Sequence, residues 1–413
     1  MEKLKGKKPS IRFPEFKDDW QHTKLSELLS EAKKRNEDLK YGKDEVLSVS
    51  GELGIVNQIE HLGRSYAGAS VHNYHVVETG DIVYTKSPLK ENPYGIIKVN
   101  KGKAGIVSTL YAVYKVNNKT CYGPWLDYYF SLDANTNRYL RPLVKKGAKN
   151  DMKINNAYVL HDRIFVPGIP EQKRIASFFT VVDKKITELK QKKSLLEQYK
   201  KGMLQKIFTQ ELKFKDDSGK PFPNWQIKKL KDVFVRKTVK NTSNSVNNVL
   251  TNSATKGIVN QEDYFDKEIA NQNNLLGYYV VDIDDFVYNP RISQSAPVGP
   301  LKRNHAVKGV MSPLYTVMKC KDGNLDFFEL YFETTLWHPY MRGIANYGVR
   351  HDRMNITNDG LEKLPIPFPK IEEQIKISKF LKSIEAKINQ VSNELELNKS
   401  FKKGLLQNMF CNG

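Results

Sequence analysis

Two polar segments of the sequence carry side chains that could contact nucleic-acid bases. Residues 289–296 hold asparagine, arginine, glutamine and serine, and residues 85–92 hold lysine, serine and asparagine. Arginine and lysine match the acceptors of guanine, asparagine and glutamine match the edge of adenine, and serine can bond to either. Ordinary solvated hairpins are the alternative interpretation. The candidate contact residues are Lys86, Ser87, Asn289, Arg291, Ser293 and Gln294.

Both segments lie in frames of equal length. A tyrosine opens each frame (Tyr84, Tyr288) and a Pro-x-Gly closes it (residues 93–95 and 297–299). A constant frame around a variable polar loop is what a recognition module needs, because rigid elements fix the position while the loop supplies the contacts.

A second pair of candidate loops contains an aligned glycine, Gly147 or Gly348. Glycine lets a backbone approach closely, and neighbouring cations can reach a phosphate or a base. This adds Lys145, Lys146, Lys149, Asn150, Arg350 and His351 as candidates. Arg64 with Tyr66, and Lys302 with Arg303, are further candidates, for which a merely solvated basic face is the alternative.

These loops belong to a chain that repeats itself. Gly-Ile-Val-Asn-Gln at residues 54–58 recurs at 257–261, a displacement of 203, and Glu171-Gln172 recurs as Glu373-Gln374 at 202. Further blocks recur in the same order at nearly the same displacement. The molecule is therefore predicted to be two copies of one unit of about 200 residues, which is too long a period for a solenoid.

The first part of each copy mixes strands and short helices. Residues 12–166 and 213–368 contain short runs rich in Val, Ile and Tyr, broken by Gly, Pro, Asn and Ser, a pattern typical of strands and loops. Short helices are expected at residues 126–135 and 327–337. The polar tract 241–248 is expected to be an exposed loop.

The second part of each copy is predicted to be one long helix. Apolar residues recur at alternating spacings of four and three, a seam of period 3.5 that is typical of coiled coils. Burying each seam against the other copy, with the copies related by a two-fold rotation, makes the helices antiparallel. The seam residues are Ile175, Phe179, Val182, Ile186, Leu189, Leu196, Ile377, Leu381, Ile384, Ile388, Val391 and Leu395.

Polar residues interrupt both seams. We expect Lys193 and Lys200 to face Asn398 and Lys402 as breaks that fix the register of the helices. The alternative is that they fray at the ends or extend to solvent.

Composition favours an anionic partner. Among 413 residues, 66 Lys and Arg against 46 Asp and Glu give a net charge of +20, which points to nucleic acid first. No stretch approaches the roughly 18 apolar residues of a spanning helix, and the basic N-terminus lacks the apolar core of a signal peptide. With three widely spaced cysteines, we expect a reduced, cytoplasmic protein without a zinc site.

Catalytic motifs are absent from the sequence. No Gly-Lys pair is followed by Ser or Thr, as a phosphate-binding loop requires. Asn92-Pro93-Tyr94 lacks one proline of an amino-methyltransferase tetrapeptide, and no glycine-rich cofactor loop precedes it. His72 and His75 lack companion metal ligands. We therefore expect a binding protein that holds no metal.

These features together resemble one family. Each long helix opens on Glu-Gln (residues 171–172 and 373–374) and ends in Lys-Gly-x-Leu-Gln-x-x-Phe (residues 201–208 and 403–410). Together with the alternation of mixed module and helix, and with Tyr-Asn-Pro-Arg-Ile-Ser at residues 288–293, the chain resembles the specificity subunits of type I restriction–modification systems over essentially its whole length.

The resemblance implies an α+β, pseudo-two-fold fold. Two tandemly repeated mixed α/β target-recognition domains, residues 1–166 and 212–368, are separated by two long antiparallel helices, residues 167–211 and 369–413, that form a coiled coil.

The resemblance also implies a non-catalytic subunit. In the family, each recognition domain reads one half of an asymmetric two-part DNA site. The helices set the gap and dock two adenine-methyltransferase subunits, which carry S-adenosylmethionine. Restriction subunits that use ATP and Mg can join, and this chain itself is expected to hold no cofactor.

Two other functions remain open from the residues alone. A stand-alone coiled-coil architectural protein would bind DNA or RNA through charge without base specificity. The second alternative is a methyltransferase that acts alone, but the sequence lacks the glycine-rich cofactor loop that such an enzyme needs.

Overall fold

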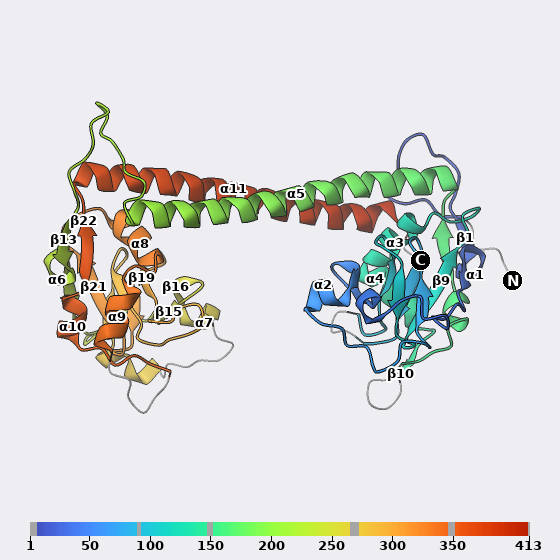
Figure 1. Ribbon diagram of the computed structural model, residues 1–413, viewed down its shortest axis with the longest axis horizontal. Helices are drawn as coiled ribbons and strands as arrows, with labels where there is room; N and C mark the ends of the chain where they lie inside the picture. The colour runs from blue at the N-terminus through green and yellow to red at the C-terminus, as the bar shows by residue number, and fades with distance from the viewer. Residues whose placement is uncertain (1–5, 89–91, 147–151, 265–271, 346–351, 412–413) are drawn as a thin grey trace. The chain divides into compact units, whose positions relative to one another are not determined.

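The chain forms two compact units, and each is described by itself. The computed structural model describes residues 6–88, 92–146, 152–264, 272–345 and 352–411. Unit 1 comprises Met1–Gln191 and Ser392–Gly413, and unit 2 comprises Lys192–Val391. The long helices α5 (Ile169–Phe208) and α11 (Ile371–Met409) each contribute to both units (Figure 1).

A four-stranded antiparallel sheet is the centre of unit 1. Its strands are ordered β2-β9-β6-β7: Leu29–Glu31, Tyr111–Val116, Ile82–Thr85 and Ile97–Val99. Side chains alternate between the faces of a strand. Ile82 and Tyr84 therefore join the large core that includes helix α3 (Gly123–Ser131), whereas Val83 joins a smaller cluster with Val113.

The other elements of unit 1 surround this sheet. Strands pair antiparallel as β1 with β12, β3 with β4, β5 with β8 and β10 with β11. Their bounds, with those of the short helices, are β1 Gln21–Lys24, α1 Leu25–Leu28, β3 Leu47–Ser50, β4 Gly54–Asn57, α2 Gln58–Leu62, β5 His75–Val77, β8 Gly105–Val107, α4 Asp133–Leu140, β10 Lys145–Lys146, β11 Met152–Lys153 and β12 Arg163–Val166.

Unit 2 repeats this plan. Its four-stranded sheet is ordered β14-β21-β18-β19: Phe234–Lys237, Thr316–Cys320, Phe286–Tyr288 and Leu301–Arg303. Phe286 and Tyr288 enter the large core, and Val287 enters the smaller cluster on the other face. The same alternation at equivalent positions confirms the predicted internal repeat at the level of the core.

The remaining elements of unit 2 follow the order of unit 1, except that α10 precedes the last strand where unit 1 has β10 and β11. Strand β13 pairs with β22, β15 with β16, and β17 with β20, all antiparallel. The bounds are β13 Gln226–Lys229, α6 Leu230–Val233, β15 Leu250–Ser253, β16 Gly257–Asn260, α7 Gln261–Tyr264, β17 Tyr279–Val281, β20 Gly309–Met311, α8 Leu325–Glu333, α9 His338–Ile344, α10 Asn358–Glu362 and β22 Pro365–Phe368.

The short helices differ from their predicted ranges. Helix α3 begins at Gly123, where Pro124 occupies its first turn, and the extended backbone of Leu132 separates it from α4. One helix over residues 126–135 was therefore wrong. Helix α8 starts at a side-chain cap on Asn324 and ends before the extended Thr334, so it stops short of residue 337. The tract 241–248 has no helix or strand, as predicted.

The two long helices run antiparallel within unit 1. Lys402 of α11 pairs with Asp183 of α5 at 2.6 Å, and Lys185 of α5 pairs with Glu394 of α11 at 2.9 Å. The partner number falls as the α5 number rises. Unit 2 shows the same direction, because Ile207 of α5 shares a core with Ile377 near the start of α11. The predicted fold class, with antiparallel helices between two mixed modules, is confirmed.

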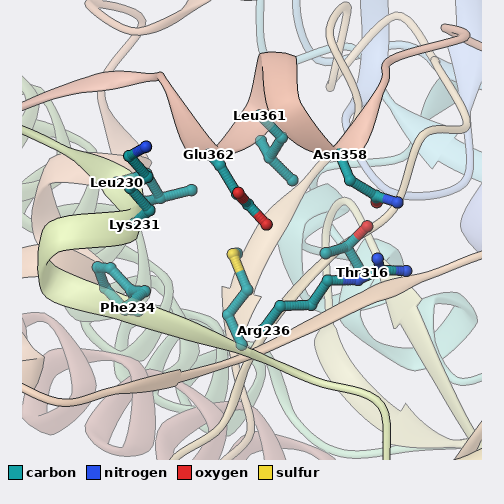
Figure 2. Close-up of a pocket in the computed structure, with 9 residues that line it drawn as sticks. Leu230, Lys231, Phe234, Arg236, Thr316, Asn358, Leu361 and Glu362 are labelled. Carbon is teal, nitrogen blue, oxygen red and sulfur yellow. The ribbon is translucent and has the colours of Figure 1, made fainter.

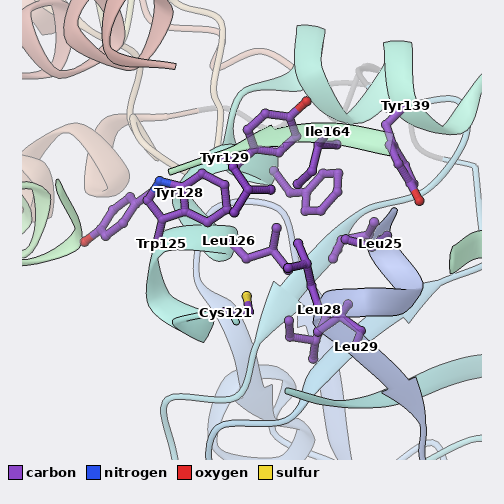
Figure 3. Packing of buried hydrophobic residues seen from close by; sticks show 14 of the residues in the cluster. Leu25, Leu28, Leu29, Cys121, Trp125, Leu126, Tyr128, Tyr129, Tyr139 and Ile164 are labelled. Carbon is purple, nitrogen blue, oxygen red and sulfur yellow. The ribbon is translucent and has the colours of Figure 1, made fainter. Parts of the chain in front are cut away.

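Phe410, the first residue after α11, closes the aromatic core of unit 1. Its ring lies 5.9 Å from that of Trp125, 6.3 Å from that of Trp20 and 6.2 Å from that of Phe179. Figure 3 shows Trp125 on α3 beside Tyr128 and Tyr129, with Leu25 and Leu28 deeper in the same cluster. The residue that follows α11 thus completes the core of unit 1, the unit in which α5 begins.

Phe208 at the end of α5 does the same in unit 2. Its ring lies 6.0 Å from that of Trp225, 5.2 Å from that of Phe327 and 5.6 Å from that of Tyr331. Phe208 and Phe410 are 202 residues apart, so the repeat extends to the contact that ties each helix end to a module.

The seam residues divide into two groups by burial. Val182, Ile186, Leu196 and Ile388 are half-buried. The others are buried: Ile175, Phe179, Leu189, Ile377, Leu381, Ile384, Val391 and Leu395.

The polar breaks have partners that differ from those expected. Lys200 pairs with Glu385 of α11 at 3.6 Å and with Glu333 of α8 at 3.0 Å, so its expected position opposite Lys402 was wrong. Lys402 pairs with Asp183, which is 202 residues before Glu385. The same cross-helix ion pair therefore occurs in both units. Lys193 instead pairs with Glu197 in its own helix at 3.8 Å, and Asn398 bonds to the carbonyl of Glu394.

The first turn of each long helix buries a carboxylate, and among the described residues only Glu171 forms an ion pair. Glu171 accepts hydrogen bonds from Arg12 Nε and Nη2, both at 2.7 Å, and from Trp20 Nε1 at 3.2 Å. Glu373 is equally buried, and its Oε2 has no hydrogen-bond partner among the described residues. Burial raises the pKa of Glu373, and Trp225 and Lys213 offset only part of that shift.

Replacing these two carboxylates by glutamine should have opposite effects. Glu171→Gln leaves Arg12 without its charged partner and should cost about 2 kcal/mol or more. Glu373→Gln removes a buried charge that forms no ion pair with a described residue, and it should stabilise the chain at neutral pH. Thermal denaturation of both variants beside the parent chain measures the difference.

The effect of Glu373→Gln on stability should depend on pH. Folding raises the pKa of Glu373, so the folded chain binds this proton more tightly than the unfolded chain does. The stability that the bound proton contributes is present below the ordinary pKa of 4.5 and is lost as the pH rises above it. The advantage of Glu373→Gln should therefore be largest at neutral pH and should shrink toward pH 4. Equal destabilisation by both variants at pH 7 would contradict this account.

Candidate nucleic-acid interface

Hydrogen bonds define the recognition frame in unit 2. The Tyr288 hydroxyl donates to the carbonyl of Val298 at 2.9 Å, and Asn289 N donates to the carbonyl of Pro300 at 2.9 Å. Gly299 has a φ of +79°, and a Cβ there would lie 2.0 Å from the carbonyl oxygen of Asn289. Only glycine fits this closure of the loop.

Unit 1 builds its frame with equivalent bonds. The Tyr84 hydroxyl donates to the carbonyl of Tyr94 at 2.8 Å, and Thr85 N donates to the carbonyl of Ile96 at 3.0 Å. Gly95 has a φ of +87°, and a Cβ there would lie 2.0 Å from the carbonyl oxygen of Thr85. The two frames are therefore the same in geometry as well as in length.

One further hydrogen bond occurs in both units, but the residue that it positions differs between them. In unit 1, Ser87 N donates to Thr85 Oγ1 at 3.1 Å. In unit 2, Arg291 N donates to Asn289 Oδ1 at 3.0 Å. A short polar side chain fixes the backbone two residues later in both units. Ser87 and Arg291 are both exposed, so the frame presents a different side chain in each unit.

The exposed part of the unit 2 loop is a tight turn. Ser293 N donates to the carbonyl of Ala296 at 3.0 Å, and Ala296 N donates back to the carbonyl of Ser293 at 3.1 Å. Ser293 Oγ also accepts from Ala296 N and lies 3.2 Å from Ser295 Oγ. Arg291, Ser293 and Gln294 are all exposed on this segment, where a duplex could reach them.

Two predicted contact residues of unit 2 are engaged inside the protein. Asn289 is 7% exposed and donates to the carbonyl of Asn252 at 3.0 Å, in addition to holding Arg291 N. Arg303 lies among carboxylates: it pairs with Asp284, with Asp326 at 2.6 Å and with Glu329 at 3.6 Å. These positions favour a role in holding the frame rather than in contacting DNA.

In unit 1, Lys86 also has an internal partner. Its Nζ donates to Asn156 Oδ1 at 2.9 Å, and Asn156 in turn donates to Glu31 Oε1 at 2.9 Å. Lys86 is half-buried. A phosphate or base would therefore have to compete with this network, whereas the neighbouring Ser87 is open.

The weaker candidates lie in separate places. The Arg64 guanidinium lies 4.6 Å from the ring centre of Tyr66, which is 60% exposed and follows helix α2. Stacked arginine and tyrosine can both contact nucleic acid. Lys302 is half-buried in β19 opposite Val287, at a different point of the frame from the Arg291 loop.

Part of the second candidate loop falls outside the described residues. The backbones of Lys145 and Lys146 form β10, which pairs with Met152 and Lys153. The remaining candidates of these loops, Lys149, Asn150, Arg350 and His351, lie outside the described residues and stay predictions.

Arg353 is a further candidate that the sequence analysis missed. It forms an isolated antiparallel bridge with Arg291, so two segments 62 residues apart meet at two arginines. Comparing the two copies of the sequence could have found it. Asp352 aligns with Asp151 at a displacement of 201, whereas Met354 aligns with Met152 at 202, so one residue is inserted between them. Arg353 is the extra residue of the second copy.

The described residues offer no metal site, and the cavity of unit 2 described below is small. No group of three or more His, Cys, Asp or Glu side chains that could hold a metal occurs within the described ranges. His75 is buried in β5, and burial lowers its pKa to about 4. Figure 2 shows a cavity of unit 2 between Leu230, Phe234 and Leu361; its space of about 20 Å³ holds roughly one water molecule.

Known proteins resemble this chain over most of its length. Residues 223–398 match the family model of the type I restriction modification DNA specificity domain. The second copy of the repeat thus matches this specificity-domain family, and the chain as a whole is similar to type I restriction–modification specificity subunits. A curated relative, the putative type I restriction enzyme MjaX specificity subunit of Methanocaldococcus jannaschii, is 23% identical over 418 residues, covering 95% of this chain and 93% of the relative.

Solved specificity-subunit structures share the fold. The type I S subunit from M. genitalium matches with a TM-score of 0.55 and 13% identity, covering 98% of this chain and 100% of that one. A chain from a study of complex assembly and conformational transition in a type I system matches with a TM-score of 0.54 and 15% identity, covering 95% and 97%. In the described part of the chain, no helix is long and apolar enough to cross a membrane.

Proposed function

We propose that this chain is the DNA sequence-recognition subunit of a type I restriction–modification complex, and that each unit reads one half of an asymmetric two-part site. The observation that carries the proposal is the conserved frame with a changed exposed residue, Ser87 in unit 1 and Arg291 in unit 2. A serine and an arginine select different base edges, so the two halves of the site differ.

Charge supplies the affinity that does not depend on sequence. With a net charge of +20, lysines and arginines neutralise phosphates and release counterions, so binding weakens as salt rises. Phosphate contacts position the subunit, and the exposed polar turn discriminates bases.

The long helices are proposed to set the gap between the two half-sites. Helix α5 has 40 residues, which at about 1.5 Å per residue is roughly 60 Å. The equivalent ion pairs Lys402–Asp183 and Lys200–Glu385 support a fixed register for the helices.

The same helices are proposed to dock two adenine-methyltransferase subunits. On α5, Leu195 is 65% exposed and Tyr199 is 49% exposed; 202 residues later on α11, Leu397 is 70% and Phe401 is 56% exposed. Single exposed apolar residues are ordinary, but an exposed pair that recurs at the period of the repeat favours two copies of one partner.

A glycine follows each exposed pair on the same helix face. Gly202 and Gly404 lie seven residues after Leu195 and Leu397, and a Cβ on either would meet nothing within 4 Å. Glycine inside a helix costs about 1 kcal/mol against alanine, and no contact within a unit requires it here. A partner helix that packs closely against this face would account for glycine at both positions.

Catalysis is proposed to reside in the partners. S-adenosylmethionine then belongs to the methyltransferase subunits, and ATP with Mg belongs to restriction subunits where these are present. This chain contributes the binding of DNA and the placement of those partners.

Disrupting one exposed pair should remove one partner. Leu195→Asp with Tyr199→Asp should reduce the bound methyltransferase subunits from two to one, because a charge on each apolar contact opposes docking. The matched pair Leu397→Asp with Phe401→Asp should do the same, and the combination should abolish binding. Native mass spectrometry of the co-expressed complex gives the stoichiometry; two partners bound to the combined variant would contradict this docking surface.

Selection from a randomised duplex library tests the recognition function. The complex of this chain with its methyltransferase partner is expected to enrich a two-part consensus with a fixed gap. Binding that an excess of random duplex removes completely, without any consensus, would instead support an architectural protein.

A further inference from the structure

Arg291 and Arg353 lie side by side at the closest spacing that antiparallel strands allow. Ile292 N donates to the carbonyl of Asp352 at 3.0 Å, and Met354 N donates to the carbonyl of Pro290 at 2.9 Å. These bonds flank the two arginines, which makes them a non-hydrogen-bonded pair. In such a pair the Cα atoms are about 4.5 Å apart and the side chains leave the same face.

Two positive charges in this position are unfavourable in the free protein. Like charges directly opposite each other destabilise a strand pair, and no carboxylate is paired with Arg291 among the residues that the structure describes. Arg353 has only its neighbour Asp352, with Nε at 3.6 Å from Oδ2. That same Nε is buried and lacks a hydrogen-bond partner within the described chain. An anionic or acceptor-rich ligand would relieve both features.

The backbone that carries the pair is already fixed. Asn289 Oδ1 accepts from Arg291 N, and the Ser293–Ala296 bonds close the turn that follows. Binding then immobilises two side chains but no loop, which keeps the entropic cost low. Two arginines on a backbone that is fixed before binding are better suited to contacting a ligand than to stabilising the fold.

We propose that the Arg291–Arg353 pair forms the DNA contact that makes unit 2 require a guanine, with Arg291 bonding to the guanine edge and Arg353 to the adjacent backbone phosphate. The inference rests on the function proposed above and names the residues and the base for one half-site. Arg353 is the new member of the site, and the pair has no aligned counterpart at Ser87 of unit 1.

Exposure assigns the two roles. Arg291 is exposed on the turn, where its planar fork can bond to both O6 and N7 of guanine. The Arg353 side chain is 26% exposed and lies beside Asp352, so it reaches less far and suits the nearer phosphate. Base contacts specify and phosphate contacts position, so the two substitutions should give different results.

The test uses the full chain in complex with its methyltransferase partner and a randomised duplex library. Arg291→Ala removes the guanidinium fork and leaves no donor that could replace it. It should erase the preference for guanine at one position of one half-site and weaken binding to the parent site about 10- to 100-fold. Arg353→Gln should leave the consensus unchanged, weaken binding to all sequences alike, and lower the slope of log affinity against log salt by about one.

A modified base tests the contact without changing the protein. Replacing the selected guanine by 7-deazaguanine removes the N7 acceptor. It should weaken binding of the parent complex but have little further effect on Arg291→Ala. Lys231→Gln, which removes an exposed charge on α6, serves as the matched control and should keep the consensus and the response to 7-deazaguanine.

Two results would overturn the inference while leaving the proposed function intact. One is a parent consensus that Arg291→Ala reproduces in full, and the other is equal binding of guanine and 7-deazaguanine by the parent complex. A parent complex that selects no two-part consensus at all would instead overturn the proposed function.

Discussion

Exchanging residues 1–166 for the corresponding segment of another specificity subunit will change one half of the recognised DNA site and leave the other half as it was. The reason is that each unit builds its own loop frame from its own hydrogen bonds, such as Tyr84 to Tyr94 in unit 1 and Tyr288 to Val298 in unit 2. Library selection with the exchanged chain and its methyltransferase partner measures both halves at once.

The junction of this exchange lies between strand β12 and helix α5. Strand β12 ends at Val166 and helix α5 begins at Ile169, so the helix is retained. The incoming segment must keep aromatic residues at Trp20 and Trp125, because both contact Phe410. The reciprocal exchange of residues 212–368 is the control and should change the other half only. A change in both halves after either exchange would contradict modular recognition.

Phe410→Ala will destabilise unit 1 strongly, although the residue lies at the far end of the sequence. Its ring is 2% exposed and contacts Trp20, Trp125, Tyr129 and Phe179. Removing a buried phenylalanine ring costs about 3–5 kcal/mol, because the lost transfer energy adds to the cavity that remains. Guanidinium denaturation followed by tryptophan fluorescence measures the loss.

The same helix supplies a matched control for this substitution. Phe401 is nine residues earlier on α11 and is 56% exposed, so Phe401→Ala should change the stability of the isolated chain by about 0.5 kcal/mol or less. Equal effects of the two substitutions would show that the end of α11 does not close the core of unit 1.

The repeat and the seams were predictable because they depend on spacing. Residues 202 apart, such as Phe208 and Phe410, have equivalent surroundings, and the period of 3.5 places the apolar stripes on one helix face. The direction of the helices followed from the symmetry of the copies. The partners of the polar breaks were not predictable, because Lys200 meets Glu385 only in the register that the whole helix pair adopts.

The candidate site was predictable as a location but not residue by residue. The comparison between copies found the frame and the exposed Arg291, since a variable residue in a constant frame is visible in the sequence. It could not separate Arg291 from Asn289 or Arg303, which have suitable chemistry but bond to Asn252 and Asp326 inside the unit. Arg353 was missed because its position depends on a strand pairing across 62 residues.

The most direct measurement of the central claim is a genome-wide map of methylated adenines in cells that express the methyltransferase partner with and without this chain. The account predicts one two-part motif, with unlike halves and a constant gap, that is methylated only when the chain is present. A methylation pattern that does not depend on the chain would contradict its role as the subunit that reads the DNA sequence.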